Sequence, residues 1–211
     1  MNVQMFTVGG LLTNCYIVSC EQTKEAIIID PGFDERLEAE KIFRHLSEES
    51  LMLKFIVNTH GHPDHTCGNN AVKEKFHVPI LVHEHDAHML EEKGKKIAEF
   101  FGFHNFSPQA DILLHEGDNV KFGNALLKVM HTPGHSRGSI SLLSEKEIFT
   151  GDTLFMGSIG LVDFPESSEH DMKNSLRRLA QLPEHLVVYP GHGPVTTIGE
   201  EKHANPFLQW L

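Results

Sequence analysis

The sequence predicts an α/β fold in which two β-sheets pack face to face and helices cover their outer sides. Two observations lead to this prediction. Short apolar runs alternate with segments of helical period, and this β-then-α order occurs twice along the chain. In addition, 211 residues are enough to bury a substantial core, so we expect one domain spanning residues 1–211.

The first half is expected to begin with an antiparallel meander of three strands. Its third strand contains the continuous apolar run Ile27–Ile29, as expected of a strand covered on both faces, and the turn residues Asp30–Gly32 end it. Apolar positions at Leu37, Ile42 and Leu46 then predict a surface helix. The elements expected in this half are strands at 3–8, 15–19, 26–29, 53–57 and 79–82, helices at 34–46 and 69–76, and a charged helical segment at 83–102.

The second half returns to β-structure at Ile112. Turn residues between short apolar runs predict a second sheet with antiparallel pairing. Before it, residues 101–111 form a loop with Gly102, Pro108 and several aromatic residues, which could act as a lid or be plain surface. The elements expected here are strands at 112–114, 119–122, 125–131, 139–143, 147–150 and 186–189, and helices at 169–182 and 199–211.

The charge and the cysteine content restrict the classes of partner. With 18 basic against 29 acidic residues, the net charge of −11 repels phosphate backbones, so we expect no nucleic-acid partner. The three cysteines are an odd number at no metal-ligand spacing, which favours a reducing compartment. The N-terminus has no export signal, and no segment approaches the roughly 20 apolar residues of a membrane span. We therefore expect a cytoplasmic protein with no membrane partner.

The stretch Thr59–His65, Thr-His-Gly-His-Pro-Asp-His, is the strongest functional signal. It places four potential metal ligands within six positions, directly after the apolar run Phe55–Val57. A loop dense in imidazole and carboxylate groups is hard to explain by packing. Gly61 and Pro63 predict a tight loop, because a straight strand or helix could not bring these side chains together. The stretch therefore indicates half of a metal site, whose other ligands come from later in the chain.

Three later stretches have the same character, a strand end followed by a Gly-rich turn with one ligand-type side chain. They contain His135, Asp152 and His192, and bring the set to five His and two Asp. Seven ligands exceed what one tetrahedral zinc ion takes, and they divide between two metals if one carboxylate bridges them. We therefore expect two divalent metal ions. Zinc is the expected metal, with iron and manganese as alternatives because imidazole and carboxylate suit all three.

In the order of these residues the chain resembles the metallo-β-lactamase fold superfamily, whose signature is H-x-H-x-D-H followed by H, D and H. The resemblance covers essentially the whole length and implies a four-layer αββα sandwich with the site at one edge. The ligand assignment that it implies is His60, His62 and His135 for the first metal, Asp64, His65 and His192 for the second, and Asp152 as the bridge.

Such a centre has a known physical logic. Two divalent cations about 3.5 to 4 Å apart lower the pKa of the water between them, so a bridging hydroxide is available as nucleophile near neutral pH. One metal polarises the substrate carbonyl, and the other receives the leaving group. Asp64 and Asp152 are the candidate catalytic residues, Asp64 by orienting or accepting the proton of the hydroxide. Asp30, at a strand end, is a candidate partner that fixes the tautomer of a ligand imidazole.

Within the superfamily the chain is most similar to glyoxalase II, hydroxyacylglutathione hydrolase, and specifically to its small bacterial relatives without the C-terminal helical domain. The similarity rests on residues 151–160 and 190–208. It implies hydrolysis of a small-molecule thioester such as S-lactoylglutathione.

Two residues depart from the glutathione-binding pattern. The full-length enzyme places a basic residue after the glycine at position 160 and an aromatic residue two positions later, where this chain has Leu161 and Asp163. The small relatives commonly have Gly-Arg-x-Asp, which Asp163 matches and Leu161 does not. An anionic tripeptide needs local cations. Those near the motif segments are Arg137, Lys173, Arg177 and Lys202.

Other activities on the same scaffold stay open. A persulfide dioxygenase would place one iron, by resemblance, on His60, His135 and Asp152, and a hydrolase could act on another ester or amide. A β-lactamase is disfavoured because a bridging Asp152 belongs to the hydrolase groups and no export signal is present. The net charge and the lack of an added substrate domain disfavour a nuclease, and the intact ligand set disfavours a non-catalytic metal-binding protein.

The other histidines are interpreted as surface or structural residues. His83, His85 and His88 lie close together on the charged segment, but outside the motif positions. His131, shortly before Pro133, is expected to fix the loop that carries His135 rather than to bind metal.

Overall fold

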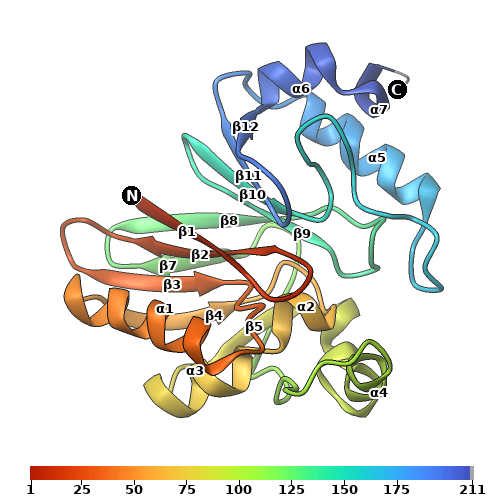
Figure 1. Ribbon diagram of the computed structural model, residues 1–211. Helices are drawn as coiled ribbons and strands as arrows, with labels where there is room; N and C mark the ends of the chain where they lie inside the picture. Colours follow the sequence, from red (N-terminus) through yellow and green to blue (C-terminus); the bar gives the residue numbers. More distant parts are fainter. Residues whose placement is uncertain (210–211) are drawn as a thin grey trace.

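The computed structural model describes residues 1–209, which form two six-stranded sheets lying against each other with helices on their outer sides (Figure 1). The strand order is β1-β2-β3-β4-β5-β6 in the first sheet and β12-β11-β10-β9-β8-β7 in the second. The predicted α/β sandwich with the layer order αββα is therefore confirmed.

The first sheet combines an antiparallel and a parallel half. The strands are β1 (Asn2–Val8), β2 (Thr13–Ser19), β3 (Glu25–Ile29), β4 (Met52–Val57), β5 (Ile80–His83) and β6 (Ile112–Leu114). The pairs β1–β2 and β2–β3 are antiparallel, as the predicted meander requires, and the pairs from β3 to β6 are parallel. Parallel neighbours need long crossovers, which here include the helices α1 (Arg36–Glu48) and α3 (Asn69–Phe76).

The second sheet is antiparallel along most of its width. Its hairpin-connected strands are β7 (Asn119–Phe122), β8 (Ala125–His131), β9 (Ile140–Leu143) and β10 (Glu147–Gly151). The helix α5 (Glu169–Ala180) then crosses over to β11 (Val187–Pro190), which pairs parallel with β10. The short strand β12 (Thr196–Thr197) completes the sheet. The other helical segments are α2 (Pro63–Thr66), the 3-10 helix η1 (Glu84–Leu90), α4 (Glu92–Phe100), α6 (Ile198–Ala204) and α7 (Pro206–Gln209).

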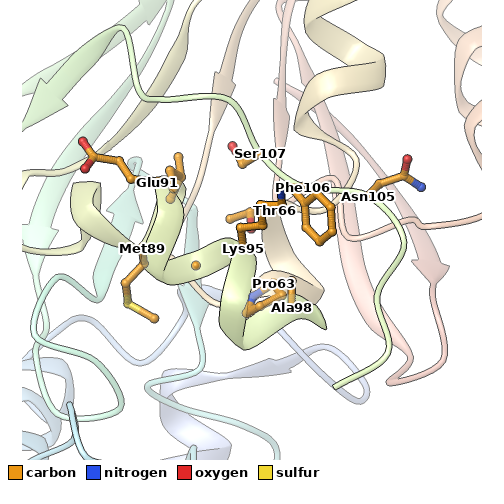
Figure 2. A pocket seen from close by; sticks show the side chains of 11 residues that line it. Pro63, Thr66, Met89, Glu91, Lys95, Ala98, Asn105, Phe106 and Ser107 are labelled. Atoms are coloured by element: carbon orange, nitrogen blue, oxygen red, sulfur yellow. The ribbon is translucent and has the colours of Figure 1, made fainter. Parts of the chain in front are cut away.

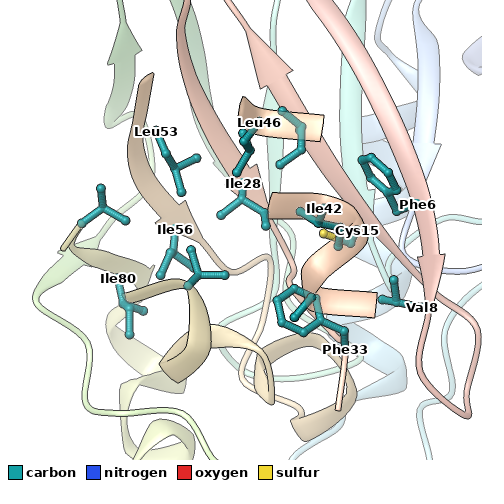
Figure 3. Close-up of a cluster of buried hydrophobic side chains, with 14 of the residues drawn as sticks. Phe6, Val8, Cys15, Ile28, Phe33, Ile42, Leu46, Leu53, Ile56 and Ile80 are labelled. Carbon is teal, nitrogen blue, oxygen red and sulfur yellow. The ribbon is translucent and has the colours of Figure 1, made fainter. Parts of the chain in front are cut away.

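Three apolar clusters separate the four layers. Strand β3 shows how the sequence builds two of them, because consecutive strand residues face opposite sides. Ile28 packs with Ile42 and Leu46 of α1 on the outer side of the first sheet (Figure 3), whereas Ile27 and Ile29 join the cluster between the sheets. The continuous isoleucine run therefore covers both faces, as predicted. The third cluster lies between the second sheet and α5, and it includes Met172, Leu176 and Leu179 of that helix.

Strand β6 corrects the sequence-based assignment. Residues 112–114 were expected in the second sheet, but they pair parallel with β5 at the end of the first sheet. A run of three apolar residues carries no information on its partner or direction. Here the chain returns along the first sheet after the segment 101–111, and Asp111 donates its backbone N–H to the carbonyl of Ile80 at 2.9 Å.

Two further segments differ from the expectation. The charged segment 83–102 begins in β5 and then divides into η1 and α4, and the C-terminal segment divides into α6 and α7 at Asn205. The predicted helix at 199–211 extends beyond the described residues. Within residues 1–209, no helix combines the length and the apolar character that crossing a membrane requires.

Candidate metal centre

The predicted ligands lie beyond the carboxyl ends of four strands, one in the first sheet and three in the second. His60 and His62 follow β4, His135 follows β8, Asp152 follows β10 directly, and His192 follows β11. Their metal-binding atoms meet at one edge of the sandwich in three overlapping groups, and within each group the atoms lie within 4.8 Å of one another. These groups are His60, His62 and His135; His60, His65 and Asp152; and Asp64, His65 and His192.

The local geometry of the first stretch is part loop and part helix. A loop was predicted throughout, but Pro63–Thr66 forms the short helix α2, with Pro63 at its first position and His62 as the extended residue before it. Proline suits this position because its fixed φ fits a first helical turn. The change of conformation at Pro63 places Asp64 and His65 on the helix and His60 and His62 in the preceding loop.

The first group is a contact of three imidazoles. Nδ1 of His62 lies 2.8 Å from Nε2 of His135. The rings of His60 and His62 have centroids 4.7 Å apart, and those of His60 and His135 lie 4.8 Å apart. His60 is fully buried. These distances let three imidazole nitrogens face one small volume.

The third group, which consists of Asp64, His65 and His192, adds a carboxylate. Nε2 of His65 lies 3.2 Å from Nε2 of His192, and each of these nitrogens approaches Oδ2 of Asp64, at 3.4 and 3.3 Å. Thr13 donates its hydroxyl to the same Oδ2 at 3.3 Å. Asp64 is thereby aimed at the two imidazoles from α2 while β2 supports it from the other side.

Asp152 lies between the first group, with His60, His62 and His135, and the third group, with Asp64, His65 and His192. Its Oδ1 is 3.4 Å from Nε2 of His65, and its Oδ2 is 3.6 Å from Nε2 of His135 and 3.5 Å from Nε2 of His192. A carboxylate that faces ligands of both groups through different oxygens has the geometry of a bridge.

The donor set fits a metal centre on its own structural evidence. Within residues 1–209, Nε2 of His60 and Oδ1 of Asp152 are both buried without a hydrogen-bond partner. Leaving buried polar atoms unpaired costs about 1–3 kcal/mol each, and a coordinated cation would satisfy both atoms. Imidazole and carboxylate together suit zinc, iron and manganese.

The electrostatics keep His60, His62 and Asp64 in the form that binds metal, whereas His65 holds a proton that a metal ion would displace. Burial lowers the pKa of His60 well below its usual value and that of His62 to about 3, and the neighbouring imidazoles add to both shifts. Burial would also lower the pKa of His65, but Asp64, Asp152 and Asp30 outweigh it and raise this pKa to about 10. Burial would raise the pKa of Asp64, yet His65 and His192 hold it below its usual range. The carboxylates of Asp30, Asp64 and Asp152 therefore favour a cation beside His65.

The ring nitrogens that point away from the centre have oxygen partners. Nδ1 of His65 lies 3.0 Å from Oδ2 of Asp30, Nδ1 of His135 lies 2.8 Å from the carbonyl of Leu161, and Nδ1 of His192 lies 3.1 Å from the carbonyl of Leu11. Such contacts fix the tautomer and the orientation of a ligand imidazole. The predicted role of Asp30 matches this geometry.

Asp86 is a buried residue of the site region that the sequence did not reveal. It is fully buried and accepts hydrogen bonds from the backbone N–H of Gly61 at 2.9 Å, from the hydroxyl of Ser136 at 2.6 Å and from the N–H of Gly138 at 2.7 Å. It thus joins the loop after β4 to the loop after β8. Its position in a charged segment gave no signal of burial.

Strand β2 holds the fourth ligand loop, which the sequence also did not indicate. Asn14 donates its side-chain amide to the carbonyls of Pro190 and Gly193 at 3.0 and 2.8 Å, and Tyr16 donates its hydroxyl to Pro190 at 2.6 Å. Because β2 belongs to the first sheet and Pro190 ends β11 of the second, these bonds tie the sheets together at the site.

Close approach explains why glycine precedes His192. A Cβ at Gly191 would overlap Oδ1 of Asp152 and would lie 2.8 Å from Cε1 of His65. The absence of a side chain there lets the β11 loop approach the carboxylate of Asp152.

The loop at 101–111 packs against α2. Asp34 accepts hydrogen bonds from the backbone N–H groups of His104 and Asn105, both at 2.9 Å, and Ser107 accepts one from Asn69 at 2.8 Å. A small cavity lies between this loop, α2 and α4, and its lining includes Phe106 from the loop, Pro63 and Thr66 from α2 and Ala98 from α4 (Figure 2). The loop is therefore held by Asp34, before α1, and by Asn69, at the start of α3, and it lines the same cavity as α2.

Comparison with known proteins gives a family match over most of the chain. Residues 8–192 match the model of the metallo-beta-lactamase superfamily. Among curated proteins, the hydroxyacylglutathione hydrolase GloC of Haemophilus influenzae is 36% identical, with 99% of this chain and 98% of that protein covered.

Two solved structures have the same fold. A structure titled BLEG-1 B3 metallo-beta-lactamase is 35% identical, with a TM-score of 0.89 and coverage of 98% of this chain and 99% of the other. The structure of TTHA1623 in a di-iron-bound form is 34% identical, with a TM-score of 0.86 and coverage of 98% and 100%. All three comparisons extend over the four strand ends that carry the seven ligands.

Proposed function

The chain belongs to the metallo-beta-lactamase superfamily, and from this premise we propose that it is a binuclear metal-dependent hydrolase of small-molecule thioesters. The observation that carries the proposal is the convergence of seven His and Asp side chains into overlapping groups, joined by Asp152. The similarity to GloC, itself described as a hydroxyacylglutathione hydrolase, supports a thioester as the substrate.

The metal assignment follows the groups. We assign His60, His62 and His135 to one ion, Asp64, His65 and His192 to the other, and Asp152 to both. When bound, two such ions supply an activated water and polarise a carbonyl. Zinc is our first choice of metal, and the di-iron form of TTHA1623 keeps iron as an alternative.

The side chains have distinct tasks in this proposal. Asp64 orients the attacking water and accepts its proton at a carboxylate oxygen, because it is the partly exposed acid of the set, with a side chain 14% exposed. Asp152 is more buried, 9% exposed, and holds the two halves of the centre together. Asp30 and the carbonyls of Leu161 and Leu11 keep the imidazoles in place.

The surroundings of the centre argue against strong recognition of an anionic thiol such as glutathione. Each predicted cation already has a partner within the chain. Arg137 pairs with Glu166 at 3.3 Å, Lys173 with Glu169 at 2.6 Å and Lys202 with Glu184 at 2.9 Å, while Arg177 donates to Asn174 at 3.0 Å.

Exposed apolar residues lie next to two of the predicted ligands instead. The carbonyls of Leu161 and Leu11 contact the imidazoles of His135 and His192, and these leucines are 60% and 58% exposed. Leu12, 65% exposed, continues this apolar rim. We therefore place S-lactoylglutathione among the substrates to be tested, beside thioesters whose thiol part is uncharged.

Two other activities are alternatives. A persulfide dioxygenase would use His60, His135 and Asp152 for one iron, and these residues lie in the same centre. The similarity to the B3 metallo-beta-lactamase BLEG-1 makes a β-lactam, or another ester or amide, a further candidate substrate.

Metal analysis combined with parallel assays separates these candidates. The purified protein would be analysed for metal and tested on S-lactoylglutathione, on a neutral thioester, on glutathione persulfide with an oxygen electrode, and on a chromogenic cephalosporin. We expect at least two metal ions per chain and thioester hydrolysis. One iron with oxygen uptake, or cephalosporin hydrolysis without thioester hydrolysis, would overturn the proposal.

A further inference from the structure

A second group of histidines lies outside the seven-ligand centre. His83 ends β5, His85 lies in η1, and His131 ends β8, so the group joins the two sheets. One ring nitrogen from each lies within 4.8 Å of the other two. The chain separation between His85 and His131 hides this group in the sequence, where His88 is the nearer neighbour of His83 and His85. Nε2 of His88 instead lies 3.3 Å from Nζ of Lys93.

We propose that His83, His85 and His131 form a second binding site for a divalent transition-metal ion of the zinc, nickel or copper type. Three imidazoles are a donor set that these ions prefer over magnesium or calcium. A partly open site suits such an ion, because His83 is buried while the side chain of His85 is 55% exposed. Water can therefore complete the coordination.

The orientation of His131 supports coordination. Its Nε2 lies 2.9 Å from the carbonyl of Arg137, so this nitrogen carries the proton and donates it. The lone pair is then on Nδ1, and a ligand imidazole commonly donates its other N–H to a carbonyl in this way. The contact also joins His131 to the loop that carries His135, as expected, and it leaves Nδ1 available for a metal; the expectation that His131 binds no metal is the part that this proposal revises.

The two other imidazoles must be able to face the same ion. The rings of His83 and His131 stack, with centroids 4.1 Å apart and planes 9° from parallel. Because an imidazole binds a metal within the plane of its ring, one of the two rings must turn when the ion binds. Nδ1 of His83 accepts the backbone N–H of His85 at 3.3 Å. A metal ion bound to Nδ1 of His83 would replace this long hydrogen bond. Burial lowers the pKa of His83 to about 4, so protons do not compete for this ring near neutral pH.

Acidic side chains beside the imidazoles favour a cation. Glu84 lies 3.9 Å from Nε2 of His85 and 3.7 Å from Nε2 of His115. Nδ1 of His115 lies 3.3 Å from Asp118. Both carboxylates are about half exposed, so Glu84 can supply a further oxygen ligand, directly or through water.

Metal titration of the loaded enzyme tests the site. Protein already saturated at the seven-ligand centre would be titrated with Zn²⁺ by calorimetry, and its bound metal counted after equilibrium dialysis. We expect one equivalent more than the centre holds, and the loss of that equivalent in His85→Ala. This exposed residue lies outside the seven-ligand centre, so the variant should fold and keep its activity. The matched control is His170→Ala, another exposed histidine, on α5, which should keep the extra equivalent.

A spectroscopic readout identifies the residues. In imidazole NMR spectra, substoichiometric Cu²⁺ should broaden the resonances of His83, His85 and His131 and leave that of His170 sharp. Absence of the extra equivalent, its persistence in His85→Ala, or broadening spread equally over exposed histidines would overturn the proposal.

Discussion

The carboxylate of Asp30 lies 3.0 Å from Nδ1 of His65, at the end of β3 and behind the metal centre. The same carboxylate accepts the backbone N–H of Thr59 at 2.7 Å and its hydroxyl at 2.6 Å. Asp30 thus joins both parts of the ligand stretch, the loop that begins at Thr59 and the helix α2. It does so in a left-handed conformation, with φ of 49°, which Asn and Asp adopt more readily than most residues.

Replacement of Asp30 should weaken metal binding without unfolding the protein. Asp30→Asn keeps the backbone preference but removes the negative charge that makes His65 a stronger ligand. We expect a loss of about 10- to 100-fold in metal affinity, measured by competition with a chromogenic chelator. Asp111→Asn, at a partly exposed pair with Lys73, is the control and should bind metal normally. Equal affinities for the two variants would contradict the role assigned to Asp30.

Loss of a single ligand should separate activity from folding. His60→Ala removes a fully buried imidazole whose Nε2 has no hydrogen-bond partner among residues 1–209, and Asp152→Ala removes the proposed bridge. Both variants should lose turnover while circular dichroism shows an intact fold. Metal at about 100 times its dissociation constant should stabilise the wild-type protein by about 2.7 kcal/mol, seen as a higher unfolding midpoint, and should stabilise these variants less. Full activity in either variant would remove the mechanism.

A methyl group at position 191 should disturb the centre sterically. The Cβ of Gly191→Ala would overlap the carboxylate of Asp152, so Asp152 or the β11 loop must move. We expect at least about a 100-fold loss of thioesterase activity, since an error of about 1 Å in a catalytic group can cost this much. Gly10→Ala is the control, because a Cβ there meets no atom of the described part of the chain within 4 Å. Metal counting would show whether a metal ion is lost as well.

The sequence predicted the layers and the seven ligands for the same physical reason. The end of a strand can be predicted where an apolar run stops at Gly or Pro. Strands that run in the same direction within one sheet end at the same edge. Ligand-type residues directly after four such runs could therefore be expected to meet. The Ile27–Ile29 run similarly showed that β3 is covered on both faces.

The features that the sequence did not reveal depend on tertiary pairing alone. Asp86 is buried only because the loops containing Gly61 and Gly138 close over it. The meeting of His83 with His131 depends on how β5 and β8 lie across the two sheets. The assignment of β6 to the second sheet was wrong for the same reason, since a run of three apolar residues fits either sheet. None of these relations has a periodic signal along the chain.

Acid should destabilise the metal-free protein partly through His83. Burial, with help from His131 and His85, lowers its pKa from 6.5 to about 4. As the pH falls from 6.5 toward 4, the unfolded chain takes up a proton that folded His83 refuses, so stability decreases across this window. Above this pH window His83 is neutral in both the folded and the unfolded protein, so it no longer changes the free energy of unfolding with pH. Urea unfolding at about pH 7 and about pH 4.5 should show a smaller decrease for His83→Asn than for the wild type. Equal decreases would show that His83 titrates normally.

Leu161 offers a direct test of substrate choice. Its carbonyl holds Nδ1 of His135, and its side chain is exposed beside the centre. Leu161→Arg keeps the carbonyl and adds a cation that a glutathione carboxylate can pair with. A hydrogen bond to a charged group contributes about 1.5–3 kcal/mol, so kcat/KM for S-lactoylglutathione should rise by about 10-fold or more, mainly through KM.

The neutral replacement separates charge from shape. Leu161→Gln removes the apolar side chain without adding charge, so it should not reproduce the gain, and an uncharged thioester should gain nothing from Leu161→Arg. If the arginine variant instead raises activity on both thioesters equally, the effect is not charge recognition. If it raises neither, the thiol part of the substrate does not pass Leu161, and the apolar rim of Leu11, Leu12 and Leu161 has no part in selecting it.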